Sequence, residues 1–372
     1  MARFTIWGRP WRLLDPHILV LTILLVLIGL AAIYSVTINI EAPDYTKVLR
    51  QLIFAGMGLL LFFGASFFDY RYFKATAWIA YGLGFVLLTS VLIIGTEIRG
   101  TTGWFEIGSL TFQPVELAKI LLVIFLSYFF SKHNDSHAQW RMIIVSGLAV
   151  VVYMVLTILQ PDLGSAVLLL AIWVGMLLFT KVKKQQLLWL LMGVIIVSVI
   201  SWNFLLYDYQ QDRVLTFFNP SLDPLGQGYN VTQSIVAIGS GQFFGRGLGL
   251  GTQSQLNFLP EAEEDFIFAV IAEELGLFGV VLLLSLFSLL FRRLYKAIKL
   301  SYDNFSYYLV LGISLMLFIQ IFVNIGTNLG LLPVAGVPLP FISAGGSSLL
   351  VNLLALGIVE SVIIHRGGAV GS

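Results

Sequence analysis

Long uncharged apolar stretches follow one another along almost the whole chain, and they restrict the fold more than any other feature. Each is close to the roughly 20 residues that an α-helix needs to cross the hydrocarbon core of a bilayer. The stretches are continuous rather than alternating with a period of two, which argues against an outer-membrane β-barrel. Only 11% of the residues are charged, against roughly 25% in soluble proteins, so the chain cannot cover itself with a hydrated surface.

These stretches predict an all-α polytopic membrane protein with ten transmembrane helices in a single domain over residues 1–372. The predicted spans cover residues 17–38, 48–68, 76–95, 115–131, 141–159, 163–180, 186–206, 266–291, 306–328 and 346–365. Residues 207–265 form by far the longest loop, between the seventh and eighth spans. Its apolar residues favour a folded outer cap, either surface-lying or re-entrant, over disorder; they include Phe243, Phe244, Leu248 and Leu250.

The basic residues lie mostly on one side of this topology. Ten spans place both termini on the same side, and most of the 21 Lys and Arg residues fall there. Cytoplasmic loops carry the excess of positive charge, so both termini are predicted in the cytoplasm and the 207–265 loop outside. The first span is too long for the apolar part of a cleavable signal. The net charge of +1 gives no indication of nucleic-acid binding, and the chain has no Cys.

Four carboxylates stand directly before the apolar run of the eighth span, at Glu261, Glu263, Glu264 and Asp265. Acidic residues at the exposed start of a helix complement its dipole, and Glu261 and Glu263 fit that structural interpretation. Asp265 is the last charge before the apolar run. Crowding by like charges and partial burial both raise the pKa of a carboxyl group, which is the usual preparation for a general base. Asp265 is therefore the first catalytic candidate.

Further charges lie within or between the predicted spans, where they are costly and usually face a protein interior or a water-filled cavity. Glu116 and Lys119 share one helix face and can pair, either as a structural ion pair or as part of a polar cavity. Asp162, between the fifth and sixth spans, can cap a helix or complete a network with Lys119. Glu273 and Glu274 are adjacent, so at least one of them must point into the bundle.

The ninth span carries Gln320, Asn324 and Asn328 at four-residue spacing, which places them on one helix face. Such a stripe either joins helices through hydrogen bonds or lines a pathway. From physical chemistry alone, the residues predict a polytopic protein with an outward-facing acidic cavity, but they do not specify a reaction.

Several long motifs, in order along the chain, resemble the SEDS family (shape, elongation, division and sporulation proteins). The matching segments are Trp104, Phe112–Lys119, Gln160–Gly164, Asp223–Tyr229, Gly251–Leu256, Phe258–Glu261, Asp265–Val270, Glu273–Gly276, Asn324–Gly326 and Gly336–Phe341. The resemblance covers essentially the whole chain, and the motifs are more similar to the elongation members than to the division members. Gly103, Glu264 and Ala344 depart from the residues usual in the family.

The resemblance implies a peptidoglycan glycosyltransferase of the bacterial cytoplasmic (inner) membrane that acts during cell elongation. Its substrate would be lipid II, the undecaprenyl-pyrophosphate-linked disaccharide peptide, polymerised on the outer face, and its partner a class B penicillin-binding protein. The resemblance also marks Asp265 as the essential acidic residue. It places Trp104, Glu116, Lys119 and Asp162 around the cavity.

Forming a β-1,4 linkage from an α-linked pyrophosphate requires inversion, hence a single in-line displacement with Asp265 as the expected base. Positive charge at the departing pyrophosphate is expected from Lys119, Arg213, Arg246 or a divalent cation such as Mg²⁺ or Mn²⁺, and no cofactor is certain. Glu274 is a further expected cavity residue. Two other functions stay open: a lipid II flippase, which would need no acceptor sugar, and a scaffold for the penicillin-binding protein.

Overall fold

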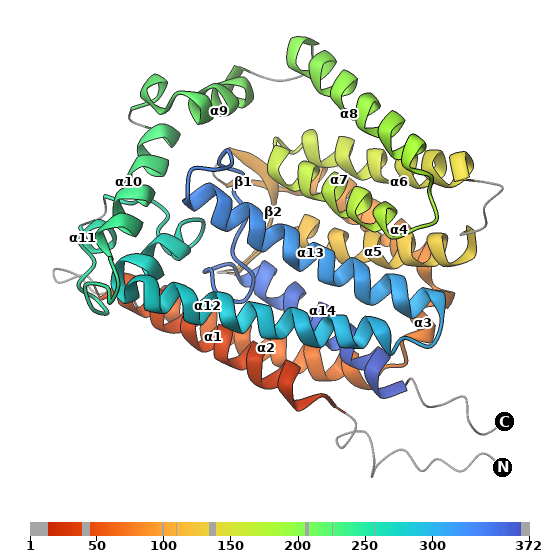
Figure 1. The fold of residues 1–372 in the computed structure, drawn as a ribbon, viewed down its shortest axis with the longest axis horizontal. Helices are drawn as coiled ribbons and strands as arrows, with labels where there is room; N and C mark the ends of the chain where they lie inside the picture. The colour runs from red at the N-terminus through yellow and green to blue at the C-terminus, as the bar shows by residue number, and fades with distance from the viewer. Residues whose placement is uncertain are drawn as a thin grey trace.

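The computed structural model describes residues 14–38, 45–98, 100–108, 110–133, 139–204, 208–224, 226–256 and 258–365. Long helices run side by side in one bundle, and shorter elements gather at one of its ends (Figure 1). The helices are α1 (Pro16–Thr37), α2 (Thr46–Phe67), α3 (Arg71–Ala75), α4 (Ala77–Ile94), α5 (Pro114–His133), α6 (Gln139–Ile158), α7 (Leu163–Leu178), α8 (Lys184–Phe204), α9 (Asp208–Phe218), α10 (Gln227–Ser240), α11 (Thr252–Gln255), α12 (Ile267–Lys299), α13 (Asn304–Asn328) and α14 (Gly346–His365).

Among the described residues, 9 helices are long and apolar enough to cross a membrane. They are α1, α2, α4, α5, α6, α8, α12, α13 and α14. The apolar helix α7, with 16 residues, occupies the place of the predicted sixth span. The predicted all-α polytopic class is thus confirmed, whereas the described part of the chain gives nine full-length candidates and one shorter helix instead of ten full-length spans.

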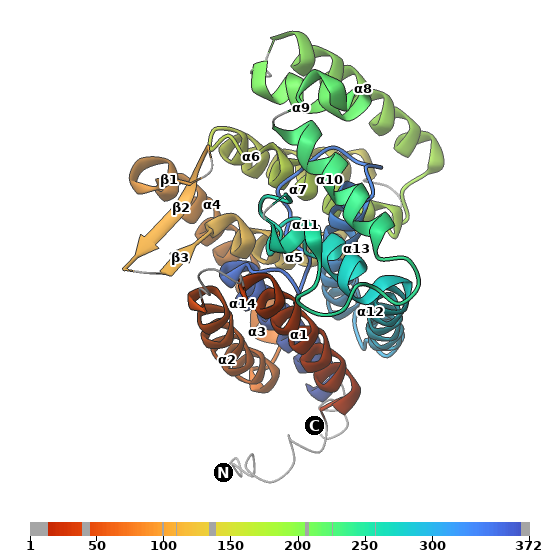
Figure 2. The ribbon, with the colours of Figure 1, turned by 90° about the vertical axis from the view of Figure 1, so that its left-hand side faces the viewer.

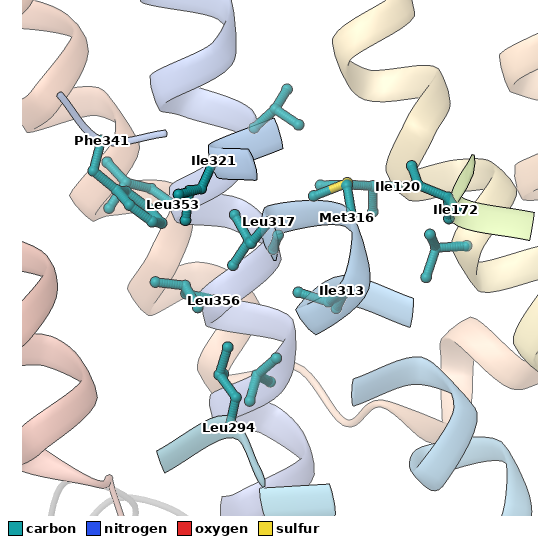
Figure 3. Packing of buried hydrophobic residues seen from close by; sticks show 14 of the residues in the cluster. Ile120, Ile172, Leu294, Ile313, Met316, Leu317, Ile321, Phe341, Leu353 and Leu356 are labelled. Carbon is teal, nitrogen blue, oxygen red and sulfur yellow. The ribbon is translucent and has the colours of Figure 1, made fainter. Parts of the chain in front are cut away.

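Helices α5, α13 and α14 form the centre of the bundle (Figure 2). In their most apolar stretches 78%, 67% and 83% of the residues are buried, against 6% in α8, which stands away from the centre. A helix that is apolar all round has no polar face to turn toward solvent, so it can occupy the interior. Met316 and Leu317 of α13 pack there among side chains of neighbouring helices, including Ile120, Leu353 and Leu356 (Figure 3).

Residues 96–112, expected to lie in a loop, form a three-stranded antiparallel sheet. Its strands are β1 (Thr96–Ile98), β2 (Thr101–Ile107) and β3 (Leu110–Phe112), in the order β1-β2-β3. Threonine and aromatic residues in the middle strand favour extended backbone. Gly100 and Gly108 have φ of 77° and 66°, values that a tight turn between strands often requires and that glycine adopts without steric cost. The sheet packs against the start of α5.

The 207–265 loop is folded, and its chain fills an interruption in α12. Gly276, with φ 63° and ψ −160°, breaks the helix. The Leu277 N–H donates to the Gln242 carbonyl at 2.8 Å, and the Arg246 N–H donates to the Glu273 carbonyl at 3.0 Å. Irregular backbone at membrane depth is tolerated only where other groups satisfy it. The loop therefore supplies the partners that the broken helix lacks, which confirms a folded cap.

We expect Gly276→Ala to destabilise the protein. The fold requires a positive φ at this position, which a residue with a side chain rarely adopts. The added Cβ would also lie 2.3 Å from the Gly245 nitrogen. The backbone conformation alone should cost about 1–3 kcal/mol, measurable as a lower midpoint of thermal unfolding in detergent. The matched control is Gly56→Ala in α2, where a Cβ meets nothing within 4 Å. An equal effect of both substitutions would contradict the role of Gly276.

Candidate functional site

A polar cavity of about 360 Å³ opens at the end of the bundle that carries the sheet and the folded loop. Segments from distant parts of the chain contribute to its wall. The polar and aromatic lining residues include Trp104, Gln113, Asp162, Arg213, Gln227, Asn230, Glu261, Glu264, Asp265, Ser347 and Ser348. The structure thus brings together four of the residues predicted from the sequence, namely Trp104, Asp162, Arg213 and Asp265.

Asp265 lies half-buried in the turn before α12, and two amides of α13 hold its backbone. The side-chain nitrogens of Asn324 and Asn328 each donate to the Asp265 carbonyl oxygen at 2.9 Å. Asn324 also donates to the Val337 carbonyl at 2.9 Å, and the Ala269 N–H donates to the Asn328 side-chain oxygen at 3.1 Å. Two of the three residues of the polar stripe predicted on the ninth span, Asn324 and Asn328, therefore join helices and loops directly behind the cavity.

The three glutamates beside Asp265 have different environments. Glu263, expected at an exposed helix start, is only 7% exposed and forms an ion pair with Lys47 of α2. Its carbonyl accepts a hydrogen bond from the Ala344 N–H at 2.8 Å. Glu264 is half-buried, whereas Glu261 is exposed, as predicted. The acidic cluster is thus divided between an internal ion pair, the cavity wall and solvent.

Glu116 and Lys119, expected in the cavity, do not line it: they are 3% and 1% exposed, with the Lys119 Nζ 2.8 Å from a Glu116 carboxylate oxygen. Asp162 caps α7 by accepting the Ser165 N–H at 2.9 Å, and its other oxygen accepts the Gln113 side-chain N–H at 3.2 Å. Burial raises the pKa of Asp162, although the hydrogen bonds from Ser165 and the charge of Lys119 act in the opposite direction. Both interpretations of Asp162, cap and network member, are therefore compatible with the geometry.

Arg246 and Glu274 do not line this cavity. Arg246 is exposed, and its guanidinium donates to the Thr252 hydroxyl at 3.0 Å. Glu274 is buried against α1, where its carboxylate accepts hydrogen bonds from the Ser35 hydroxyl. The same hydroxyl accepts the Gly249 N–H at 2.9 Å. These contacts hold the folded loop against α1 and α12.

The lining also includes Gln227, Asn230, Ser347 and Ser348, which were not among the site residues predicted from the sequence, although Gln227 lies within the matching segment Asp223–Tyr229. Gln227 and Asn230 are three residues apart on α10 and so share one helix face. This three-residue spacing of two polar side chains could have indicated a polar helix face. The two serines follow glycines at the start of α14, and the Ser347 hydroxyl accepts the Gln113 N–H at 2.9 Å.

The described residues contain one group of carboxylates suited to a cation, formed by Glu261, Glu263 and Glu264, with one oxygen from each within 4.8 Å of the others. Carboxylate oxygens are the ligands that Mg²⁺ prefers. The ammonium of Lys47 already occupies one side of Glu263. The donor set therefore fits a hard divalent cation chiefly through Glu261 and Glu264.

The chain is similar to known proteins along nearly its whole length. Residues 16–367 match the model of the FtsW/RodA/SpoVE family, described as cell cycle proteins. The peptidoglycan glycosyltransferase MrdB of Escherichia coli is 37% identical, over 97% of this chain and 96% of the relative. The stage V sporulation protein E of Bacillus subtilis is 35% identical, over 94% of this chain and 96% of the relative.

Two solved structures have the same fold. The rod shape determining protein RodA of Thermus thermophilus superposes with a TM-score of 0.72 at 30% identity, covering 97% of this chain and 99% of that one. A chain from a study of the structural coordination of polymerization and crosslinking by a peptidoglycan synthase complex superposes with a TM-score of 0.82. It is 34% identical and covers 95% of this chain and 98% of its own.

We expect Asn328→Leu to lower the free energy of unfolding by about 1–3 kcal/mol, because it leaves buried backbone groups of Asp265 and Ala269 without this partner. The matched control is Gln320→Leu, two turns earlier on the same helix. Gln320 is fully buried and neither polar atom of its side chain has a hydrogen-bond partner, so its replacement should be neutral or stabilising. Thermal unfolding of both variants measures the difference, and equal losses would contradict it.

Proposed function

This chain belongs to the FtsW/RodA/SpoVE family and is a peptidoglycan glycosyltransferase of the RodA-like type, and we propose that it polymerises lipid II at the cavity beside Asp265. The observation that carries the proposal is the position of the Asp265 carboxylate. It belongs to a half-buried residue in the wall of a polar cavity, on a turn held by buried amides. A fixed carboxylate beside an open cavity is suited to proton transfer.

The proposed reaction is one displacement with inversion. The 4-hydroxyl oxygen of the acceptor sugar attacks the anomeric carbon of the donor, and its proton passes to the Asp265 carboxylate. The bond between that carbon and the pyrophosphate oxygen breaks, and undecaprenyl pyrophosphate leaves with the bonding electrons. No covalent intermediate on the protein is needed, in contrast to the retaining pathway of glycosidases.

Arg213 is the best placed of the three cations proposed for the leaving group. It lines the cavity from α9, whereas Lys119 is buried beneath it in a pair with Glu116. Arg246 is exposed on the far side of the folded loop. Guanidinium groups match the geometry of phosphate oxygens through paired hydrogen bonds. Lys119 and Glu116 would then influence the charge state of Asp162 and would not contact the pyrophosphate.

A divalent cation such as Mg²⁺ or Mn²⁺ would be held by Glu261 and Glu264, and when bound it would neutralise charge on the departing pyrophosphate. Glu263 would keep its pair with Lys47. Polymerisation by the purified chain that continues at full rate in EDTA would exclude this role of the two glutamates.

The proposed physiological setting is cell elongation, with a class B penicillin-binding protein as partner and lipid II from the bilayer as substrate. Its support is the similarity to RodA and to a chain of a peptidoglycan synthase complex. The cavity would face outward from the bacterial cytoplasmic membrane. The exposed cations Lys183, Arg292, Lys296 and Lys299 lie at the opposite end of the bundle, and basic residues concentrate on the cytoplasmic side.

We expect Asp265→Asn to reduce polymerisation of labelled lipid II by at least about 100-fold, because the amide cannot accept the proton. The measurement is glycan chain formation by purified protein with its penicillin-binding protein. Glu106→Gln, on an exposed strand residue outside the cavity lining, is the control and should retain activity. Polymerisation by Asp265→Asn at more than a tenth of the normal rate would exclude it as the base. Transbilayer movement of lipid II without polymer would instead indicate a flippase.

Arg213→Gln and Arg246→Gln form a matched pair. Removing the cavity guanidinium should lower kcat by about tenfold or more, because charge on the leaving pyrophosphate loses stabilisation in the transition state. Removing the exposed Arg246 should change the rate less than about threefold. Steady-state kinetics with lipid II test both, and the reverse order of effects would assign the leaving-group contact to Arg246.

A further inference from the structure

A second hollow, of about 680 Å³, lies between α1 and α12 at the end of the bundle away from the cavity. These two helices run side by side toward the end where both chain termini emerge (Figure 1). We call this hollow the α1–α12 groove. Its lining consists of Pro16, His17, Val20, Leu21, Leu289, Arg292, Arg293, Tyr295, Lys296 and Lys299. The groove has no part in the proposed transferase reaction.

The groove combines a cationic rim with apolar walls. Arg292, Lys296 and Lys299 are exposed and spaced by four and three residues, so they share one face of α12. Val20 of α1 and Leu289 of α12 are 52% and 45% exposed on the walls. The cationic end lies where the helices leave the apolar zone, and the apolar walls continue toward the middle of the bundle.

The positive charge of the rim is not balanced within the described lining, which contains no carboxylate. The adjacent Asp15 lies 3.5 Å from the Arg293 guanidinium and 3.0 Å from the His17 ring nitrogen. Glu360 is fully buried nearby, where it accepts the Asp15 N–H at 3.1 Å. Lys299 also lies 4.6 Å from the centre of the Tyr295 ring. Asp15 thus balances Arg293, while Arg292, Lys296 and Lys299 remain an excess of positive charge.

The chain's own preceding segment is a poor match for this groove. Residues 1–14 contain Arg3, Arg9 and Arg12 but no Asp or Glu. That segment would add positive charge to the rim instead of neutralising it. The complementary occupant is an anion with an apolar body, available where the groove meets the bilayer.

We propose that the α1–α12 groove binds an anionic phospholipid from the membrane leaflet at that end of the bundle. Its phosphate would lie among Arg292, Lys296 and Lys299, and an acyl chain would follow Val20 and Leu289. Basic pockets between transmembrane helices are typical sites for anionic headgroups, and each nearby Lys or Arg adds to the attraction. The apolar walls distinguish a lipid from a free phosphate, which would gain nothing from them.

The test is native mass spectrometry of the purified chain titrated with phosphatidylglycerol, with phosphatidylcholine as the zwitterionic comparison. The variant is Arg292→Gln, Lys296→Gln and Lys299→Gln combined; Arg293 is kept because it contacts Asp15. We expect the variant's affinity for phosphatidylglycerol to fall on the order of 10- to 100-fold. The matched control replaces three lysines at the same end of the bundle by Gln, namely Lys181 and Lys183 between α7 and α8 and Lys184 at the start of α8.

Retention of phosphatidylglycerol by the groove variant within about threefold would overturn the proposal, and so would an equal loss in the control. Equal binding of phosphatidylcholine, or displacement of the lipid by glycerol phosphate, would also overturn it. A photo-crosslinking amino acid at Leu289 in the otherwise unchanged chain tests the site without altering its charges. A phospholipid adduct in cells supports the proposal, whereas an adduct with a protein assigns the groove to a partner chain.

Discussion

Two amides that converge on one carbonyl oxygen determine where the catalytic candidate stands. Asn324 and Asn328 of α13 donate to the Asp265 carbonyl, and Asn324 also holds the Val337 carbonyl. In an apolar interior an unpaired amide is costly, so these bonds define one arrangement of the turn and the loop. The position of Asp265 therefore depends on Asn324 of α13, which comes 59 residues later in the chain. The same bonds join the cavity floor to the centre of the bundle.

The same requirement, that buried polar groups have partners, explains how the folded loop is attached. The interruption at Gly276 exposes backbone groups of α12, and residues 242–247 satisfy them. Glu273 accepts the Gln253 N–H at 2.9 Å, and Glu274 accepts the Ser35 hydroxyl. Glu273 and Glu274 thus hold the folded loop against the bundle. The same loop contains Arg213, which lines the cavity. The polar side chains Glu273 and Glu274 of this helix therefore have a structural role.

Local patterns in the sequence predicted those features of the structure that depend on residues close together in the chain. Apolar stretch lengths indicated the polytopic class, and i, i+3 spacing predicted the Glu116–Lys119 pair, which the structure shows at 2.8 Å. Contacts between distant segments left no such pattern. Glu263 pairs with Lys47, 216 residues away, and nothing beside either residue in the chain indicates it. The break at Gly276 was equally hidden, because a glycine within an apolar run is compatible with an unbroken helix. Arg246 and Glu274 were expected in the cavity on motif and charge, but their contacts belong to the loop attachment.

The two ends of the bundle carry unbalanced charge of opposite sign. At the cavity end carboxylates outnumber nearby cations, and Lys47 and Arg213 are placed among them. An excess of carboxylates favours the binding of cations. At the other end the cations of α12 exceed the carboxylates beside them. An anionic lipid held there would act on α12, the helix that begins directly after Asp265. α12 thus extends from the groove to the turn that carries Asp265, with one interruption at Gly276.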